Sequence, residues 1–338
     1  MFRLLWNKYK LNRSMKNILI TGGAGFIGSN LIDSFLKDPR INIVRVLDNL
    51  SNGSIENLKE FMSNKRFEFI EGDIRNYQTC LISMEGIDII SHQAALGSVP
   101  RSIKDPRTST EVNILGTVNL LQAAVEKGVK RIVLAFSSST YGDHTGLPKF
   151  EDKIGNPISP YAVTKASIEQ FSQVFGNTYG LEWIGLRYFN VFGPKQNPEN
   201  PYAAVVPIFS NAFLNNGKII VNGDGETSRD FTFVENVVHM NKLAMFTENE
   251  EAINQVYNTA CSERITLNQM IRELSIITGK EITITYGPER IGDVKHSLAS
   301  INKAKKLLGY SPKVYFHEGL KLTLNWYQRN LKKPEKKA

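Results

Sequence analysis

Hydrophobic and polar positions follow two alternating periods through the first half of the chain. Short apolar runs of strand length alternate with longer stretches in which apolar residues recur every three or four positions. The longer stretches predict helices, among them 26–36, 107–127 and 160–179, and Pro160 suits a first helical turn. This alternation is typical of an α/β fold with a doubly wound parallel sheet. The short runs predict strands at 17–21, 42–47, 67–70, 87–91, 131–136 and 183–188.

The pattern changes after residue 190. Prolines interrupt it, and the helices that it predicts become shorter. We therefore expect a first domain over 1–190, in which 1–16 form an N-terminal extension, and a smaller α/β substrate-binding region over 191–338. The chain is expected to cross back to the first domain near 232–238.

The distribution of the net charge does not favour a nucleic-acid-binding protein, because the positive charge is concentrated at the two ends of the chain. The chain of 338 residues carries +8, but residues 1–16 hold five positive charges and no acid, and 329–338 hold +4. The body between these tails is therefore about −1. No stretch approaches the length of a membrane span, and the N-terminus lacks the apolar core of a signal peptide.

Cysteine usage fits a reducing compartment. Cys80 and Cys261 are the two cysteines of the chain and lie far apart in the sequence, so neither a disulfide framework nor a zinc site is expected. We expect no metal and a cytoplasmic protein.

A glycine-rich turn follows the first predicted strand and opens the first predicted helix. Gly22, Gly25 and Gly28 are spaced G-x-x-G-x-x-G. Glycines at such a turn let the backbone approach a pyrophosphate, and the helix N-terminus presents free N–H groups to the anion. The turn predicts a dinucleotide site.

Acidic residues at the ends of the next two strands extend this interpretation. Asp48 follows the second strand, where a carboxylate can hold a ribose 2′-hydroxyl and would repel a 2′-phosphate, so NAD is favoured over NADP. Asp73 and Ile74 follow the third strand and are placed to meet the adenine end. Each aspartate could instead be a turn residue.

Tyr161 and Lys165 are candidates for the chemistry. They lie four residues apart, on one face of the predicted helix 160–179. A free tyrosine has a pKa of about 10, and a nearby cation lowers it, so Tyr161 is a candidate base near neutral pH.

A run of hydroxyl residues follows the fifth predicted strand. Ligands bind at the carboxyl ends of parallel strands, and a serine there can hydrogen-bond an alcohol that is being oxidised. The run consists of Ser137, Ser138, Ser139 and Thr140.

Seven motifs together resemble a known family. The sequence resembles the extended short-chain dehydrogenase/reductases, and within them the UDP-sugar 4-epimerase branch, from about residue 16 to 326. It is most similar to bacterial UDP-N-acetylglucosamine 4-epimerases of surface-polysaccharide pathways. The motifs are T-G-G-A-G-F-I-G (21–28), H-Q-A-A-L-G-S-V-P-R-S (92–102), S-S-S-T-Y-G (137–142), S-P-Y-A-V-T-K (159–165), R-Y-F-N-V-F-G-P (187–194), N-G-D-G-E-T-S-R-D-F (222–231) and G-D-V-K-H-S-L-A (292–299).

The resemblance implies a Rossmann-type fold, bound NAD and a set of residue roles. Tyr161 would take the proton of the sugar 4-hydroxyl, Lys165 would lower the pKa of Tyr161 and hold the nicotinamide ribose, and Ser137 or Ser138 would bind the reacting oxygen. Cofactor contacts are expected from Gly22, Gly25, Phe26, Ile27, Gly28, Asp48, Asn49, Asp73, Ile74, Gln93, Ala94, Tyr161, Lys165, Tyr188 and Val191. Substrate contacts are expected from Ser98, Arg101, Ser138, Ser139, Asn190, Gln196, Ala204, Arg229, Arg290, Asp293 and Ser297.

Two features narrow the reaction. Related dehydratases and decarboxylases carry acids after the catalytic hydroxyl, where this chain has Ser138, Ser139 and Thr140. Ser297 stands where the family has a wall of the sugar pocket, and a small residue there admits a 2-acetamido group. We therefore expect C4 epimerisation of UDP-N-acetylglucosamine and UDP-N-acetylgalactosamine, with their uronic acids left open because Arg101 could meet an anionic group.

Other functions remain open at this stage. One is a UDP-glucose or UDP-glucuronate 4-epimerase, another a different NAD-dependent nucleotide-sugar oxidoreductase, and a third a nucleotide-sensing or scaffold protein without chemistry. The intact tyrosine, lysine and serines argue against the third. The resemblance also implies a homodimer paired through helices 107–127 and 160–179.

Overall fold

A parallel sheet of seven strands forms the centre of the protein, whose computed structural model describes residues 15–289 and 295–330. The strand order is β11-β6-β5-β4-β1-β2-β3, and each neighbouring pair is parallel. The order reverses between β1 and β4, the place where doubly wound sheets bind ligands. The predicted fold class is confirmed. The strands are β1 (Lys16–Thr21), β2 (Ile41–Asp48), β3 (Phe67–Glu71), β4 (Ile89–His92), β5 (Arg131–Ser137), β6 (Glu182–Tyr188) and β11 (Gln255–Thr259).

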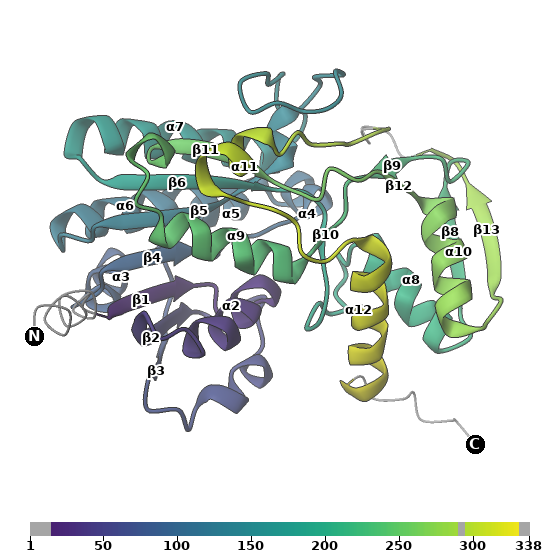
Figure 1. Ribbon diagram of the computed structural model, residues 1–338, viewed down its shortest axis with the longest axis horizontal. Helices are drawn as coiled ribbons and strands as arrows, with labels where there is room; N and C mark the ends of the chain where they lie inside the picture. Colours follow the sequence, from purple (N-terminus) through teal and green to yellow (C-terminus); the bar gives the residue numbers. More distant parts are fainter. Residues whose placement is uncertain (1–14, 290–294, 331–338) are drawn as a thin grey trace, which may run out of the picture.

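Helices cover both faces of this sheet (Figure 1). In β1, Ile18 and Ile20 pack into one apolar core and Leu19 into the other, because successive side chains of a strand point to opposite faces. The first core is closed by α2 (Phe26–Leu36) and α9 (Val234–Phe246). The second is closed by α3 (Tyr77–Ser83), α6 (Gly116–Glu126) and α7 (Pro160–Tyr179).

The helix predicted over 107–127 is interrupted in the structure. It consists of α5 (Pro106–Thr110), a π-helical turn (Glu111–Leu115) and α6, and α4 (Val99–Lys104) precedes it. A π-helical turn shifts the register of a helix and is frequent at functional sites. Here it holds Asn113, whose side chain accepts from the Leu96 N–H at 2.8 Å and donates to the Thr164 hydroxyl at 3.1 Å.

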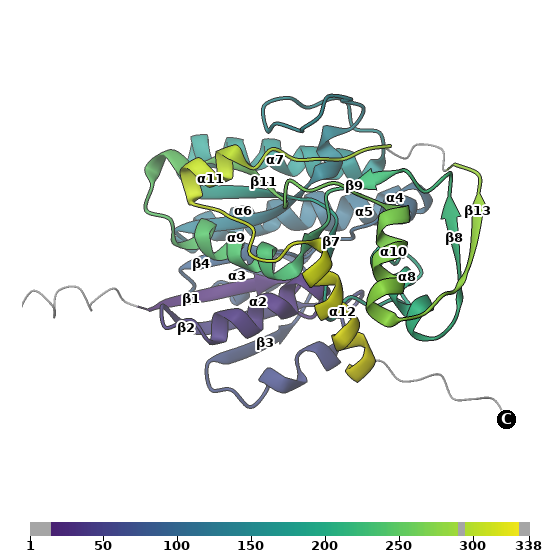
Figure 2. The same cartoon turned by 45° about the vertical axis from the view of Figure 1, so that its right-hand side comes forward.

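The C-terminal region builds a second, smaller unit beside the sheet (Figures 1 and 2). Aromatic residues such as Phe192, Phe209, Phe231 and Phe316 form its core. Its elements are α8 (Val205–Leu214), α10 (Leu267–Thr278), α12 (Phe316–Asn330) and three strand pairs, namely β7 (Val191–Phe192) with β10 (Thr232–Phe233), β9 (Ser228–Arg229) with β12 (Ile265–Thr266), and β8 (Lys218–Asn222) with β13 (Thr283–Gly287).

The chain leaves this unit after β10 and returns to the sheet. Helix α9 packs against α2 and the central strands, and β11 then adds the seventh strand beside β6. Helix α11 (Asn302–Leu308) also packs on β11. Both units are therefore built from segments that are not contiguous in the sequence. In the described residues no helix is long and apolar enough to cross a membrane.

Candidate active site

The glycine-rich turn between β1 and α2 is shaped by three glycines with different constraints. A Cβ on Gly22, whose φ is +72°, would lie 2.6 Å from the Ala94 nitrogen, and a Cβ on Gly28 would lie 2.2 Å from the Gly22 oxygen. The structure itself thus excludes side chains at these two positions. A Cβ on Gly25 would meet only the Gly22 oxygen, at 3.2 Å.

This difference indicates what the turn holds. Gly25 precedes α2, whose N-terminus has no side-chain cap in the described structure. A Cβ on Gly25 would thus need only a small shift of the Gly22 oxygen, whereas Gly22 and Gly28 meet backbone atoms at much shorter distances. The space beside Gly25, next to uncapped helical N–H groups, permits the close approach of an anion. The turn therefore fits the pyrophosphate of a dinucleotide.

The turn opens into a pocket of about 290 Å³. Gly97, Val112 and the loop 51–53 also border it. Most of the predicted cofactor contacts meet here: Gly22, Gly25, Phe26, Ile27, Gly28, Asp48, Asn49, Asp73, Ile74, Gln93 and Ala94.

Two carboxylates form the wall of the pocket where the ribose and adenine are predicted. Asp48 accepts the N–H of Ala24 at 2.9 Å and that of Leu50 at 2.8 Å, so it also holds the turn in shape. Burial raises the pKa of Asp48, and these two hydrogen bonds oppose the rise. Hydrogen bonds from Arg75 lower the pKa of Asp73 to about 2, so this carboxylate is charged at neutral pH. A negative wall suits ribose hydroxyls better than a 2′-phosphate.

Tyr161 and Lys165 lie on α7 beside this pocket. A Cβ placed on Gly97, which lines the pocket, would be 3.9 Å from the Tyr161 hydroxyl. The Lys165 ammonium donates to the Ala135 carbonyl at 2.7 Å and lies 5.9 Å from the centre of the Tyr161 ring.

The expectation that Lys165 lowers the pKa of Tyr161 is not met in this structure. Burial raises the pKa of Tyr161, and a hydrogen bond with Ser137 acts in the opposite direction. Burial also lowers the pKa of Lys165 to about 8. The physical reason is that desolvation disfavours both charged forms, while the ammonium is directed to a backbone carbonyl of β5.

The serine run forms a single turn at the end of β5. Ser137 is the serine that hydrogen-bonds Tyr161, and its hydroxyl also accepts the Ser139 N–H at 3.1 Å. Ser138 begins the short 3₁₀ turn that follows. The Ser139 hydroxyl is buried without a hydrogen-bond partner among the described residues. The geometry therefore favours Ser137 over Ser138 as the partner of Tyr161.

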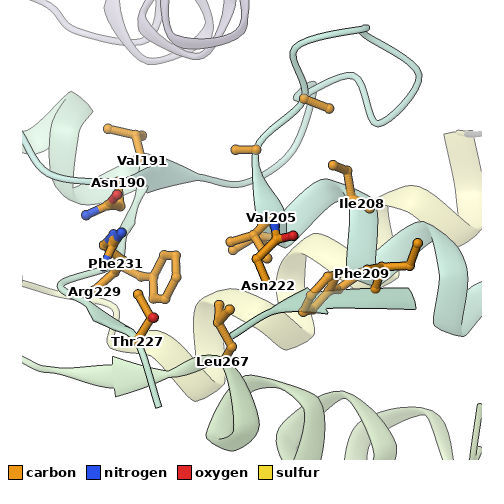
Figure 3. A pocket seen from close by; sticks show the side chains of 14 residues that line it. Asn190, Val191, Val205, Ile208, Phe209, Asn222, Thr227, Arg229, Phe231 and Leu267 are labelled. Carbon is orange, nitrogen blue, oxygen red and sulfur yellow. The ribbon is translucent and has the colours of Figure 1, made fainter. Parts of the chain in front are cut away.

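A second pocket, of about 270 Å³, lies in the C-terminal unit (Figure 3). Asn190 and Arg229 stand at one end, and the apolar side chains of Ile208 and Phe209 at the other. The Arg229 guanidinium donates to the carbonyls of Ser228 at 3.0 Å and Lys295 at 3.1 Å, which hold it at the pocket. A cationic end and an apolar end suit a phosphorylated group that carries a flat base.

Three of the predicted substrate and cofactor contacts lie elsewhere than expected or play local roles. Val191 lines the second pocket, together with Ala204, instead of the first. Tyr188 is buried, and its hydroxyl donates to the Gln93 side chain at 3.1 Å. The Ser98 hydroxyl accepts the Arg101 N–H and caps α4.

The remaining predicted contacts surround the two pockets. Arg101 donates to Asn52 at 3.0 Å, and its guanidinium lies 4.7 Å from the ring centre of Tyr202. The Gln196 side-chain oxygen is buried without a partner among the described residues. The Ser297 N–H donates to the Ser228 carbonyl at 3.0 Å, next to Arg229. Arg290 and Asp293 lie outside the described residues.

Comparison with known proteins identifies the family. The sequence pattern of the family described as GDP-mannose 4,6 dehydratase matches residues 19–323. The chain belongs to this family. Family members are extended short-chain dehydrogenase/reductases, as the motifs predicted.

Three solved structures show which members the chain is similar to. UDP-glucose 4-epimerase of Thermotoga maritima, with UDP-glucose, is 38% identical, has a TM-score of 0.87 and covers 94% of this chain and 100% of its own. UDP-N-acetylglucosamine 4-epimerase of Methanobrevibacter ruminantium, with UDP-N-acetylmuramic acid, is 36% identical, with a TM-score of 0.88 and coverage of 94% and 99%. UDP-glucuronic acid 4-epimerase of Bacillus cereus, with UDP-glucuronic acid and NAD, is 31% identical, with a TM-score of 0.86 and coverage of 93% and 99%.

The sequence interpretation missed a buried hydrogen-bond network beneath the site of this family member. His92 contacts the hydroxyls of Thr21 at 2.7 Å and Thr117 at 2.9 Å, and Thr117 donates to the Asn113 carbonyl at 2.6 Å. Asn113 in turn contacts Thr164, between the proposed base and Lys165. Burial lowers the pKa of His92 to about 3, so the network is uncharged at neutral pH. The signal in the sequence was a histidine at the end of an apolar strand.

Proposed function

We propose that this chain is an NAD-dependent UDP-sugar 4-epimerase that interconverts UDP-N-acetylglucosamine and UDP-N-acetylgalactosamine, with their uronic acids as further candidate substrates. The observation that carries the proposal is the surroundings of Tyr161. Its hydroxyl meets Ser137 beside the cofactor pocket, and the following turn offers Ser138, Ser139 and Thr140 but no acid. Dehydration and decarboxylation need such an acid, whereas epimerisation does not.

Each residue has one task in this mechanism. Bound NAD supplies a reversible hydride acceptor and a positive charge beside the phenol. Tyr161 takes the proton of the 4-hydroxyl as the C4 hydride leaves and gives it back when the hydride returns to the other face. Ser137 orients the reacting oxygen, and Lys165 holds the nicotinamide ribose. Since proton and hydride both return, one base serves both halves of the cycle.

Substrate binding is assigned to the second pocket. Arg229 would hold the pyrophosphate, because a guanidinium matches phosphate oxygens with two parallel hydrogen bonds. The apolar end, with Phe209 and Leu267, would receive the uracil. Asn190 has a φ of +35° and donates to the Asp230 carbonyl at 3.2 Å, which fixes it at the same end as Arg229.

Replacement of Ser297 by tyrosine is expected to change the substrate range. The phenol ring would fill the space proposed for the 2-acetamido group, so turnover of UDP-N-acetylglucosamine should fall about 100-fold or more while turnover of UDP-glucose persists. Product ratios read by NMR at C4 measure this. Ser297→Ala, which keeps the side chain small, is the control. Undiminished N-acetyl activity in Ser297→Tyr contradicts the substrate assignment.

The same NMR assay on a panel of UDP-hexoses tests the wider proposal. Fastest turnover of UDP-glucuronate would move the assignment to an acidic sugar and bring Arg101 into the site. Turnover limited to UDP-glucose would leave the epimerase proposal intact and overturn its N-acetyl part. Net formation of NADH would overturn the epimerase proposal itself.

We further propose a homodimer that pairs through α7 and the segment from α4 to α6. Apolar side chains are exposed on this side, with Val163 at 48%, Val174 at 54% and Ile103 at 65%. Val174→Glu should convert a dimer into a monomer in light scattering. Ile276→Glu is the control, because Ile276 is 70% exposed on α10, in the other unit. A monomeric parent protein contradicts the proposal.

A cytoplasmic location is also proposed. Cys80 and Cys261 are both buried and unpaired in the described structure. Free thiols of this kind are typical of reducing compartments.

A further inference from the structure

Helix α7 carries a third ionisable residue on the face of Tyr161 and Lys165. Glu169 follows Lys165 by four residues, so the three side chains succeed one another at intervals of one turn. Neither Glu169 nor its partner Arg187 on β6 lines either of the two pockets. The proposed binding of cofactor and substrate therefore does not explain them.

Glu169 and Arg187 form a buried ion pair of two parallel hydrogen bonds. The Arg187 Nε donates to Oε1 at 2.9 Å and its Nη2 to Oε2 at 2.7 Å. The side chains are 12% exposed for Glu169 and 3% for Arg187. A bidentate ion pair that is largely buried keeps its geometry and is only weakly screened by salt.

Arg187 is itself fixed by two further contacts. Its Nη1 donates to the Glu151 carbonyl at 3.0 Å, and its guanidinium lies 4.9 Å from the ring centre of Tyr141. These contacts leave the guanidinium little freedom to follow another partner. The Glu169 carboxylate is consequently held at one place along α7.

The groups that face Lys165 show why this place matters. On α7 these groups are Tyr161 and Glu169, and on β5 the ammonium meets the Ala135 carbonyl. On β4 it faces His92, which is neutral at neutral pH because burial lowers its pKa to about 3. Glu169 is thus the acid that offsets the burial of Lys165 among the described residues. Burial lowers the pKa of Lys165, Glu169 acts to raise it, and the two effects together leave it at about 8.

We propose that Glu169, fixed by Arg187, is a positioning residue that keeps Lys165 in its ammonium form through the reaction. The proposal rests on the function proposed above, because that function gives Lys165 its role. The direction of the effect is set by charge. Loss of Glu169 removes a negative neighbour and leaves the Arg187 cation unpaired, and both changes favour neutral Lys165.

The test compares pH profiles of variants that retain their cofactor. In Glu169→Gln the alkaline limb of kcat should move by about one pH unit toward lower pH, so activity near pH 8.5 falls about sixfold more than activity near pH 6.5. Retention of NAD on desalting should fail at a correspondingly lower pH, because Lys165 is proposed to hold the nicotinamide ribose. This second readout needs no substrate.

A double variant guards against misfolding. Glu169→Leu with Arg187→Met removes both charges and leaves neither unpaired, so it should fold where a single change destabilises. Its alkaline limb should move in the same direction as that of Glu169→Gln, but by less, because the Arg187 cation is gone as well.

The chain offers a matched control in a second arginine–glutamate pair. Arg131 donates to Glu182 at 2.6 Å, and Glu182 lies five residues before Arg187 on β6, roughly 16 Å along the strand. Glu182→Gln should lower thermal stability and leave both pH readouts in place.

Three results would overturn the inference. The first is that the alkaline limb of kcat in Glu169→Gln coincides with that of the parent protein while the Tm falls. The Glu169–Arg187 ion pair would then stabilise the fold without acting on Lys165. The second is an equal movement in Glu182→Gln. The third is unchanged pH dependence of NAD retention in both Glu169 variants. If the parent protein has no epimerase activity, but Glu169→Gln loses NAD on desalting at a lower pH than the parent does, the proposed reaction is wrong and this inference stands.

Discussion

Replacement of Tyr161 by phenylalanine is expected to abolish epimerisation and leave both ligands bound. The change removes one oxygen, the one proposed to take and return the proton of the 4-hydroxyl. General acid–base catalysis contributes roughly 10² to 10⁴-fold, so we expect a loss of about 10³-fold in kcat. The remainder of the site stays in place, because the Tyr161 ring keeps its packing and Lys165 keeps its hydrogen bond with Ala135.

The measurement separates chemistry from binding. Epimerisation is followed by NMR at C4, bound NAD by its absorbance after denaturation, and affinity for UDP by calorimetry. Tyr257→Phe is the control, because Tyr257 is fully buried on β11 and its hydroxyl donates only to the Ala252 carbonyl, at 2.9 Å. That variant loses a buried hydrogen bond without losing a proposed catalytic group. If Tyr161→Phe keeps a tenth of the parent activity, the base is another residue.

The first half of the fold was predictable from sequence because its strands are buried on both faces. Continuous apolar runs such as 131–136 and 183–188 stand out against the helices between them, and each became a strand of the sheet within two residues of the predicted bounds. The seventh strand, β11, was not predicted. Its sequence Q-V-Y-N-T is mostly polar, so no apolar run marks it. Asn258 can be polar and buried there because its side chain donates to the carbonyls of Lys149 and Ser300.

The interruption of the helix over 107–127 has a similar explanation. Apolar residues continue at helical spacing through the π-helical turn, so the period alone gives an unbroken helix. What selects the turn is the pairing of Asn113 with the backbone of Leu96 and with Thr164. These partners are distant in the sequence.

In the candidate site, too, some features could be predicted from local sequence and others depend on contacts between distant residues. Gly28 could be predicted because the residues that it packs against, Gly22 and Gly23, are close to it in the chain. The sign of the pKa shift at Tyr161 could not, because helical spacing places Lys165 nearby but does not tell how deeply both groups are buried. Arg187, the partner of Glu169, lies on a different strand, so no local pattern joins the two.

Replacement of Gly25 by valine is expected to remove NAD binding while the protein stays folded. Gly25 has φ −78° and ψ 177°, a conformation open to any residue, and its added Cβ would meet only the Gly22 oxygen, at 3.2 Å. The two methyl groups of valine would then stand in the pocket at the N-terminus of α2, where the pyrophosphate is proposed to lie. We expect affinity for NAD to fall at least 100-fold, or about 2.7 kcal/mol, and epimerisation to fail with it.

Gly28→Ala is the comparison variant for this prediction, because packing alone requires a glycine at position 28. A Cβ there would lie 2.2 Å from the Gly22 oxygen and 2.7 Å from the Gly23 Cα, so backbone atoms must move and stability itself should fall. Thermal unfolding and NAD content, measured on both variants, separate a glycine that the fold requires from one that the ligand requires. Normal NAD content in Gly25→Val would place the pyrophosphate elsewhere. A loss of stability equal to that of Gly28→Ala would assign Gly25 to the fold, because then packing alone would account for a glycine at that position.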